Sequence, residues 1–360
     1  MKKILALILA LIMILGALSA CDSASDKSGA DNAGSSDTAL GNGETDNADA
    51  SQSGENDEGG EENKEDGSAE NQDKVNVLDG KKVIFIGNSH TYYGMTVLEK
   101  TQSVLTQEAR RNDKGYFYQI CKSNGADVAV TNWTFGNHSF DDLFNHCDAD
   151  RGCNGVDHLS YLTDRNYDYV VMQQGTSNDS VDTFISDCSM VMDVFKEANP
   201  DVKFVFLVSR RAQEKNLKWL AGLKILDEMG VIIVDWGKLV DDVITGKTQV
   251  PGAVESYEQN SFIIRKSESD GYHPNMLTGY ITSLMTYCAI TGETAEGQDY
   301  SFCGNNKLNA KFSFNTFIST YYTYKGATTN FKKIFNSESD MNGIQKLVDK
   351  YLEEKAYLKY

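Results

Sequence analysis

Short apolar runs recur along the chain, and most are followed by stretches whose apolar residues have helical spacing. The runs span residues 83–86, 127–134, 167–173, 202–208 and 231–234. Their length and β-branched residues are typical of strands buried on both faces of a sheet. Strands that alternate with helices predict a parallel sheet with right-handed crossovers. We therefore expect a three-layer α/β fold, with a parallel sheet of about five strands and helices on both faces.

The intervening pattern predicts the helices and their ends. Ser139 suits the N-cap of a short helix, and Gly230 and Gly292 suit C-terminal caps. Pro274 fits the first turn of the helix that follows it, where its missing N–H costs nothing. Residues 116–121 have the composition of a short strand. The helices predicted from periodicity cover residues 95–111, 181–198, 214–229 and 275–291, with a closing helix from Met341.

The first twenty residues indicate export. Lys2 and Lys3 precede an apolar stretch at 4–17, which is shorter than the ~20 residues a spanning helix needs. The segment Leu18-Ser-Ala-Cys21 resembles the bacterial lipobox, and this resemblance implies cleavage before Cys21 and lipidation of that cysteine. We expect residues 1–20 to be a lipoprotein signal peptide and the protein to be anchored in the bacterial cell membrane, facing outside the cytoplasm. An ordinary signal peptide is the alternative.

Residues 22–74 form an acidic segment of low complexity. It holds sixteen acidic residues against three lysines, so it carries −13 of the net charge of −18, and Leu40 is its one large apolar residue. Such a segment buries too little apolar surface to offset the entropy of ordering. We expect residues 21–75 to be a disordered linker and residues 76–360 to form one α/β domain, with a C-terminal extension from about 293.

The rest of the composition narrows the class of protein. The folded part is mildly acidic, which argues against a nucleic-acid partner, and we expect a monomer without a cofactor or metal. An even number of cysteines in an exported domain permits disulfides, with Cys147 and Cys153 as the nearest pair. Buried free thiols are the alternative, above all for Cys288. The six cysteines after Cys21 are Cys121, Cys147, Cys153, Cys188, Cys288 and Cys303.

Ser89 follows the first predicted strand at a glycine turn. Open α/β sheets place ligands and reactive groups at the carboxyl ends of their strands. A serine hydroxyl needs a base to become a useful nucleophile. His90 is adjacent in sequence, so its side chain points elsewhere, whereas His273 is preceded three residues earlier by Asp270, a spacing that suits a serine triad.

These residues carry a resemblance to a known family. Gly87-Asn88-Ser89, followed far downstream by Asp270-x-x-His273, resembles two blocks of the SGNH (GDSL-type) hydrolases, in particular a lipoprotein-type branch of SGNH-like domains. The resemblance covers roughly residues 81–292 and implies a flavodoxin-like sheet and esterase or acyl-hydrolase chemistry. It assigns Ser89 as nucleophile, His273 as base and Asp270 as its orienting carboxylate. It also implies that the N–H of Gly136 contributes to the oxyanion hole.

The sequence departs from the family pattern at two places. Asn88 stands where the family has an aspartate. Residues 167–179 resemble the third block but contain an extra residue, so the side-chain amide of the oxyanion hole is either Gln174 or Asn178. A positioned amide donor is worth ~3 kcal/mol to a tetrahedral oxyanion.

Residues near the predicted strand ends are candidates for substrate contacts. Asn88 is one of them. Arg210 and Arg211 could hold a carboxylate or phosphate, or form a plain surface pair. Aromatic residues near strand ends could stack on a sugar or serve in packing: Trp133, Trp236, Tyr92 and Tyr93.

The sequence thus favours a membrane-anchored, extracellular serine esterase that removes acyl groups, for example acetyl, from carbohydrate or other small esters. A non-catalytic glycan- or peptide-binding lipoprotein and an O-acyltransferase are the alternatives. A metal site is less favoured, since its candidate ligands match no known spacing: His138, His146, His158, Asp141, Asp142 and Asp157.

Overall fold

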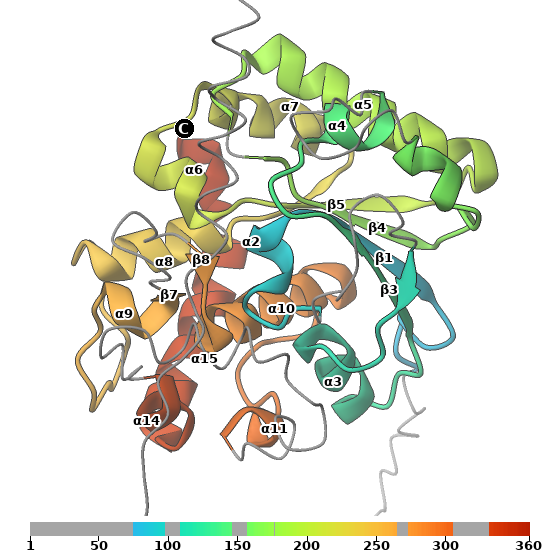
Figure 1. Cartoon of the computed structure of the whole chain (residues 1–360). Helices are drawn as coiled ribbons and strands as arrows, with labels where there is room; N and C mark the ends of the chain where they lie inside the picture. The colour runs from blue at the N-terminus through green and yellow to red at the C-terminus, as the bar shows by residue number, and fades with distance from the viewer. Residues whose placement is uncertain (1–74, 98–108, 146–156, 176, 265–272, 305–330) are drawn as a thin grey trace, which may run out of the picture. The chain divides into compact units, whose positions relative to one another are not determined.

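A six-stranded, mostly parallel sheet organises the fold (Figure 1). The computed structural model describes residues 75–97, 109–145, 157–175, 177–264, 273–304 and 331–360. All five predicted parallel strands are present, and the α/β fold class is confirmed. The strands are β1 (Lys82–Gly87), β2 (Arg110–Arg111), β3 (Ala129–Thr134), β4 (Tyr169–Met172), β5 (Lys203–Leu207) and β6 (Ile232–Val234).

The strand order is β2-β3-β1-β4-β5-β6. The five strands from β3 to β6 pair in parallel, whereas β2 lies antiparallel on the outer edge of β3. Residue Ile86 of β1 pairs with Trp133 of β3 on one side and with Met172 of β4 on the other. The chain order therefore reverses beside β1, and a crevice for ligands is expected at the carboxyl end of that strand.

Alternate residues of β1 enter different layers of the core. Val83 and Phe85 belong to the cluster that includes α3, α8, α10 and α15, and Ile84 and Ile86 belong to the cluster that includes α4, α5, η4 and α7. This period of two explains why an unbroken apolar run forms a strand covered on both faces. The helices are α3 (Tyr116–Ser123), α8 (Trp236–Ile244), α10 (Met276–Thr291) and α15 (Glu338–Glu353) on one side, and α4 (Phe140–Phe144), α5 (Val181–Ala198), η4 (Lys218–Gly222) and α7 (Leu223–Glu228) on the other.

Shorter elements complete the described part. Helix α2 (Ser89–Tyr92) follows β1, and α6 (Arg210–Lys215) follows β5. The two-residue strands β7 (Ile263–Ile264) and β8 (His273–Pro274) pair with each other. The remaining pieces are η3 (His158–Tyr161), α9 (Gln259–Phe262), α11 (Ser301–Gly304), α14 (Phe331–Phe335) and η6 (Ala356–Lys359).

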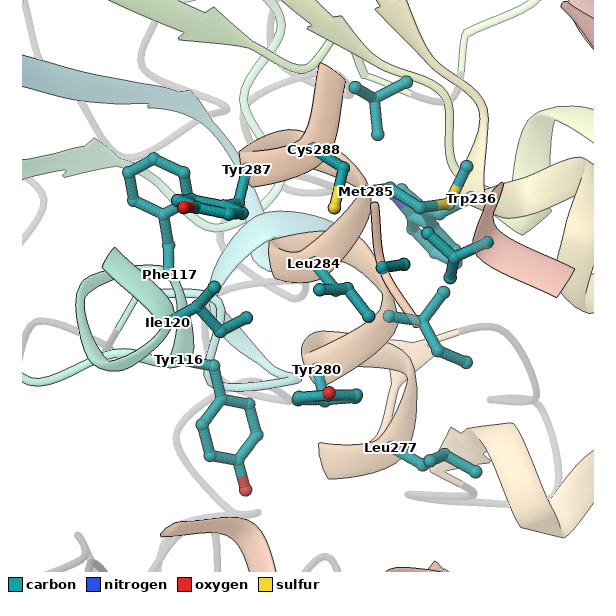
Figure 2. Close-up of a cluster of buried hydrophobic side chains, with 14 of the residues drawn as sticks. Tyr116, Phe117, Ile120, Trp236, Leu277, Tyr280, Leu284, Met285, Tyr287 and Cys288 are labelled. Atoms are coloured by element: carbon teal, nitrogen blue, oxygen red, sulfur yellow. The ribbon is translucent and has the colours of Figure 1, made fainter. Parts of the chain in front are cut away.

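Helix α10 is buried on all sides, from Met276 to Cys288. Figure 2 shows its side chains between residues of α3, such as Phe117, and Trp236 of α8. Three of its buried hydroxyls are satisfied within the helix, because Thr282, Ser283 and Thr286 each donate to the carbonyl four residues earlier, at 2.7–2.8 Å.

A pair of glycines brings α10 against the loop that follows α2. A Cβ on Gly279 would lie 1.5 Å from the carbonyl oxygen of Gly94. No side chain fits at position 279, so the two backbones are in direct contact. This contact fixes where α10 begins relative to α2.

The structure confirms several helix predictions. Helix α5 has the predicted bounds, and Ser139 caps α4 with a full capping box. Gly292 ends α10 in the left-handed conformation at φ 74°. The closing helix α15 begins three residues before the predicted Met341.

Other predictions of local structure are wrong. Residues 116–121 form the start of α3 rather than a strand, since Tyr116, Phe117, Ile120 and Cys121 share one buried helical face. The predicted helix 214–229 is divided into α6, η4 and α7, because Asn216 adopts a left-handed conformation at φ 47°.

Two further predictions fail at the ends of elements. Pro274 is not in the first turn of α10; it pairs in β8, and Asn275 is the N-cap instead. The predicted helix 95–111 ends in strand β2, and its centre lies outside the described residues.

The cysteine prediction is tested in part. Cys121, Cys188, Cys288 and Cys303 are buried free thiols, and burial raises their pKa. Cys147 and Cys153 lie outside the described residues, as do Cys21, the signal peptide and the acidic linker. Within the described ranges, no helix combines the length and apolar character that crossing a membrane requires.

Asp235, after β6, is a buried carboxyl that caps α8. It accepts hydrogen bonds from the backbone N–H of Lys238 at 2.9 Å, from Gln213 at 3.3 Å and from the hydroxyl of Tyr360. Burial raises the pKa of Asp235 to about 7 despite these bonds.

Asp340 is equally buried, but its pKa moves the other way. It accepts hydrogen bonds from Val254 N, Glu255 N and the Tyr257 hydroxyl at 3.0–3.3 Å, and from Ser337. Burial alone would raise the pKa of Asp340, but the four donors outweigh it and hold the pKa below its usual value.

We predict that Asp235→Asn stabilises the fold in a pH-dependent way. Because the folded-state pKa of Asp235 lies above the unfolded value of 3.8, its stabilising contribution is complete below about pH 4 and is lost as the pH rises through 7. Asparagine does not titrate and still caps the helix. The free energy of unfolding of the variant relative to the wild type should therefore rise by about 4 kcal/mol between pH 4 and pH 8, measured by urea unfolding.

Asp340→Asn is the matched control. The folded-state pKa of Asp340 is depressed, so its contribution is present above the unfolded pKa and is lost as the pH falls. This variant should be less stable than the wild type at pH 7, with the difference shrinking toward acid. The same pH trend in both variants would contradict the prediction.

Candidate active site

The candidate site begins where β1 ends. Gly87 lies so close to β4 that a Cβ would meet the carbonyl oxygen and the Cβ of Gln173 at 2.9 and 3.0 Å. Asn88 is the N-cap of α2, and Ser89 is the first residue of that helix. Ser89 therefore stands at the carboxyl edge of the sheet, half-buried, beside the central strand.

Asn88 has a structural role that explains why asparagine stands there. Its side-chain oxygen accepts from the N–H of His90 at 3.1 Å, and its side-chain nitrogen donates to the carbonyl of His138 at 3.2 Å. The residue is 4% exposed. An aspartate could cap the helix, but it could not donate to the carbonyl. The side chain is buried and engaged at both ends, and its predicted contact with substrate stays a prediction.

Ser89 and His273 meet across the fold. The Ser89 Oγ and the His273 Nε2 are 2.8 Å apart, although 184 residues separate them in sequence. His273 is held by the pairing of β8 with β7, and the N–H of Asn275 donates to Phe262 O at 2.9 Å. Asp270, the predicted orienting carboxylate, lies outside the described residues.

Aromatic rings enclose the imidazole of His273. The ring of His90 stacks on it at 5.1 Å between centroids, and the ring of Tyr93 lies 4.4 Å away. Burial lowers the pKa of His90 well below its usual value, and the charges of His273 and Arg211 lower it further. His90 is therefore neutral and is a wall of the site. The sequence interpretation missed this role because it judged His90 only as a base for Ser89.

Gly136 lies two residues beyond the end of β3, next to the nucleophile turn. The N–H of Phe135 donates to Gly87 O at 2.8 Å, which carries the parallel pairing one residue further. Gly136 is exposed and its carbonyl bonds to the His138 ring at 2.7 Å. Gly136 therefore lies beside the end of β1, and its oxyanion role stays a prediction.

The two candidate oxyanion amides have different surroundings, and their role stays a prediction. The side-chain nitrogen of Gln174 donates to Asp187 at 3.0 Å, and its oxygen accepts from the N–H of Phe140 at 3.2 Å. Asn178 is exposed, and its oxygen accepts from the N–H of Lys218 at 2.8 Å. Both side chains form hydrogen bonds with residues that are distant in sequence, and the local sequence does not predict such bonds.

The paired arginines have different surroundings. Arg210 is 5% exposed and its guanidinium lies 3.5 Å from Asp241, so it forms an ion pair within the fold, and its contact with substrate stays a prediction. Arg211 is half-buried and pairs with Glu214 at 3.1 Å, and its charge acts on His90 beside the site. Trp133 and Trp236 are fully buried and belong to the core, not to a sugar-binding rim.

The predicted metal ligands do not assemble. The rings of His138 and His158 pack edge to face at 5.4 Å, and Asp142 bonds to Ser139 in the capping box. Among the described residues, no three side chains of metal-ligating type converge. His146 lies outside them.

Comparison with known proteins gives matches only among solved structures. No family model and no curated protein matches the sequence. A protein from Parabacteroides merdae described as a GDSL-like lipase matches with 14% identity and a TM-score of 0.40, over 61% of this chain and 99% of that one. A variant of an acetyl xylan esterase from Geobacillus stearothermophilus matches with 13% identity and a TM-score of 0.37, over 59% and 95%.

A carbohydrate esterase family 2 enzyme from Corynascus thermopiles, which carries a carbohydrate-binding domain, matches with 18% identity and a TM-score of 0.35, over 59% of this chain and 66% of that one. At such values the similarity carries no argument about activity. The chemistry of the site therefore has to be argued from its own residues.

We predict that Asn88→Asp destabilises the protein by about 2 kcal/mol at pH 7, because a carboxylate oxygen would face the carbonyl of His138 without a proton to share. The midpoint of thermal unfolding should fall accordingly. Asn178→Asp is the control, since its oxygen caps Lys218 at the surface and an aspartate keeps that bond. Equal stability of the Asn88 variant and the wild type would contradict the assigned hydrogen bond.

Proposed function

We propose that the protein is a serine ester hydrolase with Ser89 as nucleophile and His273 as general base. The observation that supports this most is the 2.8 Å contact between the Ser89 Oγ and the His273 Nε2 at the carboxyl edge of a parallel sheet. A nucleophile and a base within hydrogen-bond reach are the signature of covalent catalysis. The enclosing rings of His90 and Tyr93 support a pre-positioned base.

The proposed reaction has two stages. The Ser89 Oγ forms a bond to the ester carbonyl carbon while its proton passes to the His273 Nε2, and the carbonyl electron pair moves onto oxygen. The bond to the leaving oxygen then breaks, and that oxygen takes the proton from Nε2. Water repeats the sequence on the acyl-enzyme and restores Ser89. Asp270 would hold the other ring nitrogen of His273.

The proposed substrates are acyl esters, for example acetyl esters of carbohydrates. This choice follows from the expected location outside the cytoplasm, where glycans are accessible, and from the half-buried, open position of Ser89. The positive charge of Arg211 acts on His90 beside the site, so the proposed substrates include esters that carry a nearby anionic group.

We predict that Ser89→Ala and His273→Ala each lower the hydrolysis of p-nitrophenyl acetate by at least about 10³-fold, and that the double variant is hardly worse than either single one, because the two residues act as a unit. A fluorophosphonate probe should label Ser89, as read by peptide mass spectrometry. Ser186→Ala, on the exposed side of α5, is the control.

The same assay separates the alternatives. A wild-type protein that neither hydrolyses esters nor reacts with the probe would be a binding protein on this fold, and the proposed function would be wrong. Acyl transfer to an added sugar in preference to water would identify an O-acyltransferase with the same nucleophile.

We further propose that the protein is anchored to the membrane through Cys21 and the acidic linker. Cells grown with an alkyne-bearing fatty acid should incorporate it into the wild-type protein, and Cys21→Ala should abolish the label, because the thiol is the attachment point. The protein should then shift from the membrane fraction to the soluble fraction. Labelling that survives the substitution would refute the anchor.

A further inference from the structure

The oxyanion hole of the proposed hydrolase needs a third donor. In the proposed reaction, two donors are the N–H groups of Ser89 and Gly136. The side-chain nitrogen of Gln174 donates to Asp187, and the exposed side chain of Asn178 accepts from the N–H of Lys218 through its oxygen. The inference that follows rests on the proposed function.

The hydroxyl of Tyr92 lies next to Gly136. A Cβ built on Gly136 would be 3.1 Å from the Tyr92 Oη, and that oxygen is the one atom such a Cβ would closely approach. Gly136 has no side chain to fill this space, so the hydroxyl borders its backbone. Tyr92 is 8% exposed, so its side chain is buried rather than in solvent.

Tyr92 also has a fixed relation to the nucleophile. It follows Ser89 by three residues on α2, and residues three apart lie on the same side of a helix. The two residues are thus carried by one turn of backbone. A displacement of α2 would move the nucleophile and this hydroxyl together.

The ring of Tyr92 is held in place by its neighbours. It stacks on Tyr93 at 5.1 Å with 25° between the ring planes, and Tyr93 contacts His273 at 4.4 Å. A continuous aromatic wall therefore links the hydroxyl to the general base. A donor that is already ordered stabilises developing charge without a cost of reorganisation.

We propose that the Tyr92 hydroxyl is the third oxyanion donor of the site. When the Ser89 Oγ bonds to the carbonyl carbon, the carbonyl electron pair moves to oxygen, and this oxygen accepts hydrogen bonds from Ser89 N–H, Gly136 N–H and Tyr92 Oη. No proton is transferred from Tyr92, so the donor is unchanged when the carbonyl forms again. Tyrosine hydroxyls are among the side chains that serve this purpose in enzymes.

Tyr92→Phe tests the proposal in the full-length protein with p-nitrophenyl acetate. The ring and its stacking remain, and only the hydroxyl is lost. We expect kcat to fall by about 100-fold with KM changed by less than about twofold, since the hydrogen bond strengthens only as charge develops on the oxygen. The rate at which the fluorophosphonate probe labels Ser89 should fall in parallel, because its phosphoryl oxygen occupies the same place.

Tyr351→Phe is the matched control. Tyr351 is also 8% exposed, and its hydroxyl donates to Asp242 at 2.8 Å, away from Ser89 and His273 in sequence and in hydrogen bonding. It should lose stability but keep the wild-type kcat. Comparing the two variants separates the loss of a buried hydroxyl from the loss of an oxyanion donor.

A double-mutant cycle with Gly136→Ala tests the position of the hydroxyl. The added methyl would crowd the Tyr92 Oη at 3.1 Å, so the cost of Gly136→Ala should be smaller in the Tyr92→Phe background. Strictly additive effects would contradict the proposed contact.

Other outcomes overturn the inference without touching the proposed function. A Tyr92→Phe variant with kcat within twofold of the wild type would show that the hydroxyl is not a donor, and loss of activity only in Tyr92→Ala would assign the ring a packing role. A wild-type protein with no Ser89-dependent hydrolysis would instead refute the proposed function, and this inference with it.

Discussion

The pairing of β1 on both edges is the constraint on which the rest of the structure depends. β3 and β4 occupy its two edges, and helices cover its two faces, so its polar backbone and its apolar side chains are all satisfied within the fold. The chain can reach solvent only at the end of the strand. Because neighbouring connections leave in opposite directions there, the residues after Gly87 meet a crevice rather than a packed surface.

The second half of the site depends on a different kind of packing. His273 precedes α10, whose residues from Met276 to Cys288 are all buried, so the apolar packing of that helix fixes where the imidazole begins. The rings of His90 and Tyr93 then restrict its orientation. Many weak apolar contacts thus determine the positions of the few polar atoms that would react.

The sequence predicted the elements whose signal is strong and local. Short apolar runs identified the five parallel strands, and the Gly-Asn-Ser turn with a distant histidine identified the two residues, Ser89 and His273, that meet. Strand β2 was not predicted, because its two residues are exposed and give no apolar signal. Residues 116–121 were predicted as a strand because they are rich in aromatic residues, although their buried positions have helical spacing. The hydrogen-bond partners of Gln174 and Asn178 could not be predicted from the local sequence either. These partners come from other elements of the fold: Asp187, Phe140 and Lys218. Asn88 looked like a departure from a motif, yet its bond to His138 gives it a physical reason.

The contact between Gly94 and Gly279 has a consequence for motion. Two backbones that touch without side chains between them leave no soft layer in which one element can slide past the other. The turn after α2 and the start of α10 therefore move as one body. Thermal fluctuation then displaces Ser89 and His273 in the same direction, and the separation of their reactive atoms varies less than the position of either atom in space.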